Sequence, residues 1–162
     1  MGKKELIRLI LVSAVIVLVD QASKKWIVMH LGLHEYIVVI DNFFHITHVL
    51  NPGGAFGFFA TQSDLVRKIV FLFLSSVVAL FICWFYFRVA RTHIVLSYGL
   101  ALIFSGAVGN LVDRFQYGHV VDFLDFYVGT AHWPAFNVAD AAISCGMAVL
   151  IFHVVFKKIP DF

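Results

Sequence analysis

The sequence predicts an all-α integral membrane protein in which four transmembrane helices carry a small extracytoplasmic β-sheet. Hydrophobic residues make up 61% of the 162 residues and charged residues only 14%, with a mean hydropathy of +0.91. A soluble domain carries about 25% charged residues, so this deficit and the long apolar runs indicate a protein that lies in a lipid bilayer. We expect residues 1–162 to form one polytopic membrane domain.

Four apolar runs are long enough to cross a bilayer, at about residues 6–25, 69–87, 94–111 and 137–156. The first begins like a signal peptide, with basic residues before a short apolar core. No small-residue cleavage site precedes the charges that follow it, and its helix is about 30 Å long, which matches the bilayer core. We therefore interpret it as a retained span, anchored at the interface by Lys24, Lys25 and Trp26.

The third span carries small residues at every fourth position, namely Ser97, Ala101, Ser105 and Gly109. Such a stripe lets a neighbouring helix pack closely.

Residues 29–62 differ from the apolar runs and are expected to form the extracytoplasmic β-region. The runs 36–40 and 43–50 favour strands, and Asp41-Asn42 between them is typical of a turn. The glycine-rich segment that starts at Asn51 interrupts regular structure. These features predict a small sheet that lies on the membrane.

Positive charges orient the chain through the positive-inside rule. The cations at the two termini and between the second and third spans fall on one side: Lys3, Lys4, Arg8, Arg88, Arg91, Lys157 and Lys158. Five fall on the other: Lys24, Lys25, Arg67, Lys68 and Arg114. We expect both termini to be cytoplasmic. Seven polar residues then collect at the outer face: Asp20, Asn51, Asn110, Arg114, Asp122, Asn137 and Asp140.

The candidate catalytic pair is Asp122, expected in a surface loop, and Asp140, expected at the mouth of the fourth helix. Asp140 lies about two residues inside apolar sequence, where ionisable groups are costly and indicate a functional site. If Asp122 lies within a few ångströms, repulsion makes the pair hold a single proton. One carboxylate can then take a proton from water while the other donates to a carbonyl oxygen, as in peptide hydrolysis. Arg114 or Asn137 could hold this geometry or neutralise residual charge.

A structural interpretation of the same residues stays open at this point. Polar groups at helix ends often only cap the helix, and Asp113 with Arg114 could form an ion pair. Asp125 is expected to be a solvated surface acid. Asp20 is expected to support helix packing rather than to react.

Other chemistries fit the sequence less well. The eight histidines include no His-Glu-x-x-His pattern and are mostly scattered through loops, so no metal or other cofactor is expected. Ser105 and His153 lie at depths in the bilayer that differ by roughly 10 Å, too far for a serine protease pair. Cys83 and Cys145 are expected to be buried small hydrophobes. No nucleic-acid partner is expected.

Five motifs resemble those of the lipoprotein signal peptidase (signal peptidase II) family. They are Val19-Asp20-Gln21-Ala22-Ser23-Lys24, Asn51-Pro52-Gly53-Gly54-Ala55-Phe56-Gly57, Gly109-Asn110-Leu111-Val112-Asp113-Arg114, His119-Val120-Val121-Asp122-Phe123 and Phe136-Asn137-Val138-Ala139-Asp140. They occur in the family's order and extend from the first span to the last.

The resemblance implies an aspartic endopeptidase of the bacterial inner membrane, with its site near the outer leaflet. By similarity, Asp122 and Asp140 are the catalytic pair, without metal or cofactor. The residues implied to bind substrate or support the site are Asn51, Gly53, Asn110, Arg114, Asn137 and Asp20. The implied substrate is a prolipoprotein with a diacylglyceryl-modified Cys, cut N-terminal to that Cys.

The resemblance also implies inhibition by the cyclic peptide globomycin and contact with membrane lipid; we expect a monomer. Phe56, Phe58 and Phe59 are hypothesised to form an apolar flap over the site. The alternative function is a proton-coupled small transporter that uses Asp20 and Asp140 as a relay. The nearly all-apolar inner halves of the spans disfavour it, and a structural membrane protein gives no reason for acids to converge.

Overall fold

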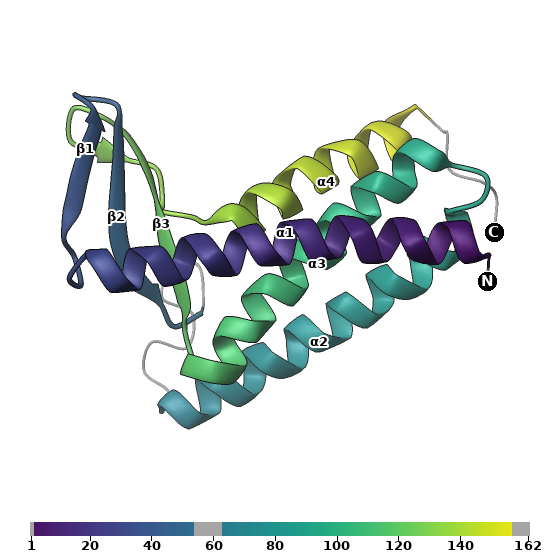
Figure 1. Cartoon of the computed structure of the whole chain (residues 1–162), viewed down its shortest axis with the longest axis horizontal. Helices are drawn as coiled ribbons and strands as arrows, with labels where there is room; N and C mark the ends of the chain where they lie inside the picture. Colours follow the sequence, from purple (N-terminus) through teal and green to yellow (C-terminus); the bar gives the residue numbers. More distant parts are fainter. Residues whose placement is uncertain (1, 54–62, 157–162) are drawn as a thin grey trace.

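The computed structural model describes residues 2–53 and 63–156 and shows four long helices with an antiparallel sheet at one end (Figure 1). The helices are α1 (Lys3–His30), α2 (Asp64–Val89), α3 (Ile94–Tyr117) and α4 (Val138–Val155). The strands are β1 (Tyr36–Ile40), β2 (Phe44–Asn51), β3 (Val120–Val128) and β4 (Ala131–His132). They pair antiparallel in the order β1-β2-β3-β4. The predicted fold class is confirmed.

Each of the four helices is long and apolar enough to span a membrane. Three of them extend beyond their predicted spans: α1 covers 3–30 rather than 6–25, α2 covers 64–89 rather than 69–87, and α3 continues past residue 111 to Tyr117. The extra turns of α3 carry Asp113 and Arg114, whose side chains have partners inside the protein and therefore do not need to leave the helix. α3 ends at Gly118, where a φ of 81° gives the left-handed cap that glycine adopts without strain.

The first residues of α1 and the last turn of α4 lie at the same end of the bundle, opposite the sheet (Figure 1). An even number of spans requires this arrangement. The sheet and the polar ends of α1, α3 and α4 therefore share the other end.

α3 is the central helix of the bundle. About 61% of the residues in its 18-residue apolar stretch are buried, against at most 22% in the corresponding stretches of the other three helices. Its backbone touches that of α4: a Cβ added at Gly106 would lie 2.2 Å from the Ala139 carbonyl oxygen. The predicted small-residue stripe faces α1 instead: Ser97 and Ser105 hydrogen-bond to Arg8 and Ser13 of α1, and Ser97, Ala101 and Ser105 are fully buried.

The sheet is larger than the sequence predicted. β1 and β2 match the two predicted runs, but β3 falls in the stretch that was expected to be a surface loop. β3 pairs with β2 and places Val49 opposite Asp122. Its first four residues, Val120 to Phe123, are all buried, and Val121 and Phe123 pack against the end of α1 at Ile27 and Leu31. The expectation that Asp122 comes from a loop is therefore wrong.

We predict that Gly106→Ala lowers the apparent melting temperature of the detergent-solubilised protein by several degrees. Replacement of glycine by alanine inside a helix normally stabilises the helix by about 1 kcal/mol. Here, however, the added methyl group must push α4 away from α3. The measurement is a thermal melt followed by a thiol-reactive or intrinsic fluorophore. Ala148→Val enlarges an exposed side chain of α4 and serves as the control. Equal or higher stability of Gly106→Ala would contradict the close α3–α4 contact.

Candidate active site

Asp122 lies on β3 with only 2% of its surface exposed. Each of its carboxyl oxygens accepts a hydrogen bond from an asparagine side chain. The Asn51 Nδ2 donates to Oδ2 at 3.0 Å, and the Asn137 Nδ2 donates to Oδ1 at 2.7 Å. Asn51 ends β2, and Asn137 precedes α4. Two elements distant in sequence therefore hold this carboxyl group on both sides.

Asp140 lies in the first turn of α4 and forms a capping box with Asn137. Its Oδ2 accepts a hydrogen bond from the Asn137 backbone N–H at 3.3 Å, and its own N–H donates to the Asn137 Oδ1 at 2.9 Å. Its Oδ1 accepts from the Asn110 Nδ2 of α3 at 2.7 Å. The cap thus turns the Asp140 carboxyl group back toward the start of the helix.

Asn137 contacts both acids and thereby brings them together. Its backbone and Oδ1 engage Asp140, while its Nδ2 donates to Asp122. The side chain is completely buried, so these contacts are not shared with water. The convergence of Asp122 and Asp140 expected from the sequence is what the structure shows.

The three asparagines present their amide nitrogens to the acids because their amide oxygens are occupied by other donors. The Asn51 Oδ1 accepts from the Gly53 N–H at 2.9 Å, and the Asn137 Oδ1 accepts from the Asp140 N–H. The Asn110 Oδ1 instead accepts from the Lys24 ammonium group at 3.1 Å. Each amide is thereby fixed in one of its two orientations.

Burial raises the pKa of Asp122 from 3.8 to about 6, and the negative charge of Asp140 contributes to the rise. The hydrogen bonds from Asn51 and Asn137, and the positive charge of Lys24, act in the opposite direction but do not cancel it. Asp122 therefore holds a proton below about pH 6.

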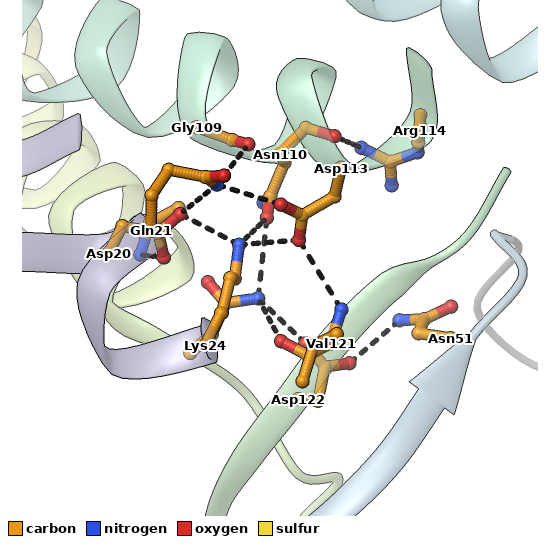
Figure 2. A network of polar contacts seen from close by, with 12 residues as sticks. Asp20, Gln21, Lys24, Asn51, Gly109, Asn110, Asp113, Arg114, Val121 and Asp122 are labelled. Atoms are coloured by element: carbon orange, nitrogen blue, oxygen red, sulfur yellow. Dashed lines mark hydrogen bonds and ion pairs between the residues drawn. The ribbon is translucent and has the colours of Figure 1, made fainter. Parts of the chain in front are cut away.

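A cluster of buried charges lies beside Asp122 (Figure 2). Lys24 Nζ is 2.8 Å from a carboxylate oxygen of Asp20 and 2.8 Å from one of Asp113, and Gln21 hydrogen-bonds to both carboxylates. The Asp20 Oδ1 also accepts from the Ala139 N–H at 2.9 Å, next to Asp140. The cluster ties α1 to α3 and to the start of α4.

This cluster corrects two expectations. Lys24 was predicted to anchor α1 at the interface, but its side chain is only 4% exposed because it neutralises two buried acids. Asp113 was considered as a partner of its neighbour Arg114 and instead pairs with Lys24. The sequence did offer a signal for the ion pair, because Lys24 follows Asp20 by four residues and therefore lies on the same helix face. That spacing did not show that the pair is buried.

Arg114 lies near both acids and interacts electrostatically with each of them. Its Nη1 donates to the Asn110 carbonyl oxygen at 3.3 Å, and its guanidinium group lies 5.9 Å from the centre of the Phe71 ring. Among the described residues, its buried Nε has no hydrogen-bond partner.

Gly53 supports the site through its backbone. It has a φ of 95°, and an added Cβ would lie 2.4 Å from the Phe71 ring. Only glycine accepts both conditions, so the Gly53 N–H can reach Asn51. The hypothesised flap residues Phe56, Phe58 and Phe59 lie outside the described residues.

Two further expectations about single side chains are wrong. Asp125 is not solvated, since its side chain is 13% exposed and accepts a hydrogen bond from His132 at 2.9 Å. Cys145 is exposed on α4 rather than buried, whereas Cys83 is half-buried, and both are free thiols. No group of three or more metal-ligating side chains occurs in residues 2–53 and 63–156.

The chain resembles known proteins in both sequence and fold. The family model described as Signal peptidase (SPase) II matches residues 12–156. The chain belongs to the signal peptidase II family. It is 61% identical to the lipoprotein signal peptidase of Desulforapulum autotrophicum, over 99% of each chain. It is 42% identical to the lipoprotein signal peptidase of Syntrophus aciditrophicus, over 96% of this chain and 97% of that one.

A solved structure described as a bacterial membrane enzyme has the same fold. It superimposes with a TM-score of 0.81 at 27% identity and covers 93% of this chain and 88% of its own. Together with the four membrane-length helices, signal peptidase II membership makes the chain a multi-pass membrane peptidase.

We predict that the Asp122 carboxyl group titrates near pH 6 and that Asp140→Asn lowers this midpoint. Removal of the Asp140 negative charge removes a repulsion that favours protonated Asp122, so the shift is downward. The measurement is infrared titration of the protonated carboxyl band, assigned through its loss in Asp122→Asn. Asp125→Asn, on the same strand but bonded to His132, is the control. A wild-type midpoint near 4 would contradict the burial argument.

Proposed function

We propose that the chain removes the signal peptide from diacylglyceryl-modified prolipoproteins by aspartic catalysis at Asp122 and Asp140. The observation that carries the proposal is the pair of acids held on either side of Asn137, one of them with a raised pKa. Two carboxyl groups in different protonation states are what amide hydrolysis by general acid and general base requires. Membership of the signal peptidase II family supplies the substrate class.

In the proposed reaction Asp140 is the base and Asp122 the acid. Asp140 takes a proton from a water molecule as its oxygen attacks the carbonyl carbon, while protonated Asp122 gives its proton to the carbonyl oxygen. The intermediate then returns one hydroxyl proton to Asp122, Asp140 gives its proton to the amide nitrogen, and the carbon–nitrogen bond breaks. Both acids end in their starting states. The buried Nε of Arg114, without a partner among the described residues, is available to a substrate carbonyl group.

The lipid part of the substrate is proposed to lie against an apolar groove between α2 and α3. The groove has a volume of about 460 Å³ and is lined mainly by aliphatic and aromatic side chains, among them Ala79, Leu80, Val108, Leu111, Val112 and Phe115. It follows α3 beside the turns that carry Asn110 and Arg114. Acyl chains bound there would keep the modified Cys close to the two acids, and the bond N-terminal to that Cys would be cut.

The proposed location is the bacterial inner membrane, with both termini cytoplasmic and the site near the outer leaflet. Cations such as Lys4, Arg8, Arg88 and Arg91 lie at the end of the bundle opposite the sheet, as the positive-inside rule requires of a cytoplasmic face. β1 exposes the apolar side chains of Ile37 to Ile40, which suits a sheet resting on lipid. We further propose that the protein acts as a monomer and that globomycin-type cyclic peptides bind the same site.

The alternative, a proton-coupled transporter with Asp20 and Asp140 as a relay, is not favoured. Asp20 is fully buried, paired with Lys24 and bonded to the start of α4. A carboxylate with these partners caps a helix and has no free position for a transported proton.

We predict that Asp122→Asn and Asp140→Asn each lower kcat for a diacylated precursor by about 10²–10⁴-fold, the usual contribution of a positioned acid or base. Cleavage is measured in detergent or lipid vesicles with purified protein, and Asp125→Asn is the matched control on β3. Thermal melts establish that each variant is folded. Substantial turnover by a folded Asp122→Asn or Asp140→Asn variant would remove that residue from the proposed reaction.

We also predict that a precursor without the diacylglyceryl group has a much higher KM than the modified form. The apolar groove can contribute binding only if acyl chains are present. The comparison uses one precursor peptide with and without the lipid. Equal kcat/KM for the two forms would contradict the proposed role of the groove and leave the acid pair untouched.

A further inference from the structure

Lys24 is a buried cation that is connected to Asp140 by hydrogen bonds through the Asn110 side chain. Its side chain is 4% exposed, and its Nζ has three partners: Asp20, Asp113 and the Asn110 Oδ1 (Figure 2). The first two are ion pairs that any structural lysine would make. The third is a neutral amide, and it leads to Asp140.

The contact with Asn110 decides which end of that amide faces Asp140. With the Oδ1 accepting from Lys24, the Nδ2 is directed to the Asp140 Oδ1 at 2.7 Å. A rotation of the amide by half a turn would direct its oxygen to the carboxylate, where it repels. The other donor to Asn110 Oδ1 is the Asn137 Nδ2 at 3.3 Å, and that nitrogen is already engaged with Asp122 at 2.7 Å and with the Val121 carbonyl oxygen at 3.3 Å.

Asn110 differs in this respect from the other two asparagines of the site. The amides of Asn51 and Asn137 are oriented by backbone N–H groups, which are present whatever the side chains. The amide of Asn110 is oriented chiefly by a side chain, so its direction depends on the residue at position 24.

Lys24 also contributes charge to the site. Five other charged groups face the acids or Lys24: Asp122 on β3, Asp140 on α4, Arg114 and Asp113 on α3, and Asp20 on α1. The residue contributed by β2 is the neutral Asn51. The positive charge of Lys24 favours the ionised form of the neighbouring carboxyl groups and lowers the pKa of Asp122.

We propose that Lys24 is a positioning residue for catalysis: by holding the Asn110 amide with its nitrogen toward Asp140, it keeps Asp140 hydrogen-bonded as the ionised base. The proposal rests on the proposed function, because it assigns Asp140 the role of base. Lys24 does not touch the substrate and acts only through Asn110 and its charge.

The test compares Lys24→Met, Lys24→Gln and wild type in the diacylated-precursor assay, with kcat, KM and pH profile measured for each. Lys24→Met loses both the hydrogen bond and the charge, and we expect kcat to fall about 10²-fold, the size of effect that a misplaced catalytic group produces, with KM unchanged. Lys24→Gln retains a donor for Asn110, and we expect it to recover part of the lost kcat.

The pH profile separates positioning from a purely structural role. Loss of the Lys24 positive charge raises the pKa of Asp122, so we expect the high-pH limb of the profile, which reports loss of the Asp122 proton, to move to higher pH in Lys24→Met and in Lys24→Gln. Lys25→Met removes the same charge from the adjacent exposed residue and is expected to leave kcat and the profile unchanged.

Lys24→Met leaves two buried acids without their cation, which can prevent folding. A second comparison therefore uses two further proteins: the single variant Asp113→Asn, and a double variant that carries both Lys24→Met and Asp113→Asn. The double variant keeps the net charge of the cluster, because one positive and one negative group are lost together, and Asp20 keeps the Ala139 N–H. We expect the double variant to have the lower kcat and the upward-shifted profile relative to Asp113→Asn.

Two outcomes overturn the proposal. One is an unchanged kcat and profile in folded Lys24→Met; the other is a loss of activity that follows thermal stability alone, with the profile unmoved. Wild-type protein in the same assay tests the proposed function separately. If wild type does not cut the precursor, the proposed function is wrong. If wild type is active and the Lys24 variants are unaffected, only the role of Lys24 is refuted.

Discussion

The side chain of Asn137 is the contact on which the rest of the site depends. It caps α4 with its oxygen and donates to Asp122 with its nitrogen, while its backbone N–H donates to Asp140. The capping requirement of one helix thus sets the position of both acids. Because a cap is a local structure fixed by a three-residue spacing, the site needs only that β3 bring Asp122 to the beginning of α4.

The remaining polar residues make this arrangement possible inside an apolar bundle. A buried ionised group is costly unless it is paired and hydrogen-bonded, and Asp20, Lys24 and Asp113 satisfy one another. Small residues provide the space: a Cβ at Gly109 would lie 2.8 Å from the Asp20 Oδ2. Close helix packing and the buried charge cluster therefore depend on each other, and α3 supplies both Gly109 for the packing and Asp113 for the cluster.

The spans, β1, β2 and the convergence of Asn51, Asn110, Asn137 and the two acids could be predicted because they follow from local patterns: apolar runs, β-favouring residues and polar residues at the ends of the spans. β3 could not, because Asp122 and Asp125 interrupt an otherwise strand-like run and a strand is settled by its partner, here β2. The burial of Lys24 could not be predicted from the sequence either. Its position four residues after Asp20 suits a surface pair equally well, and only the packing of α1 on α3 decides between them.

The most direct test of the acid pair is an experimental structure with a peptide in which a tetrahedral hydroxyl replaces the scissile carbonyl group. That hydroxyl oxygen stands in for the oxygen atoms of the reaction intermediate. The geometry predicts that it lies within hydrogen-bonding distance, about 3 Å, of one carboxyl oxygen of Asp122 and one of Asp140. A bound peptide whose hydroxyl contacts only one of these acids, or neither, would contradict catalysis by the pair.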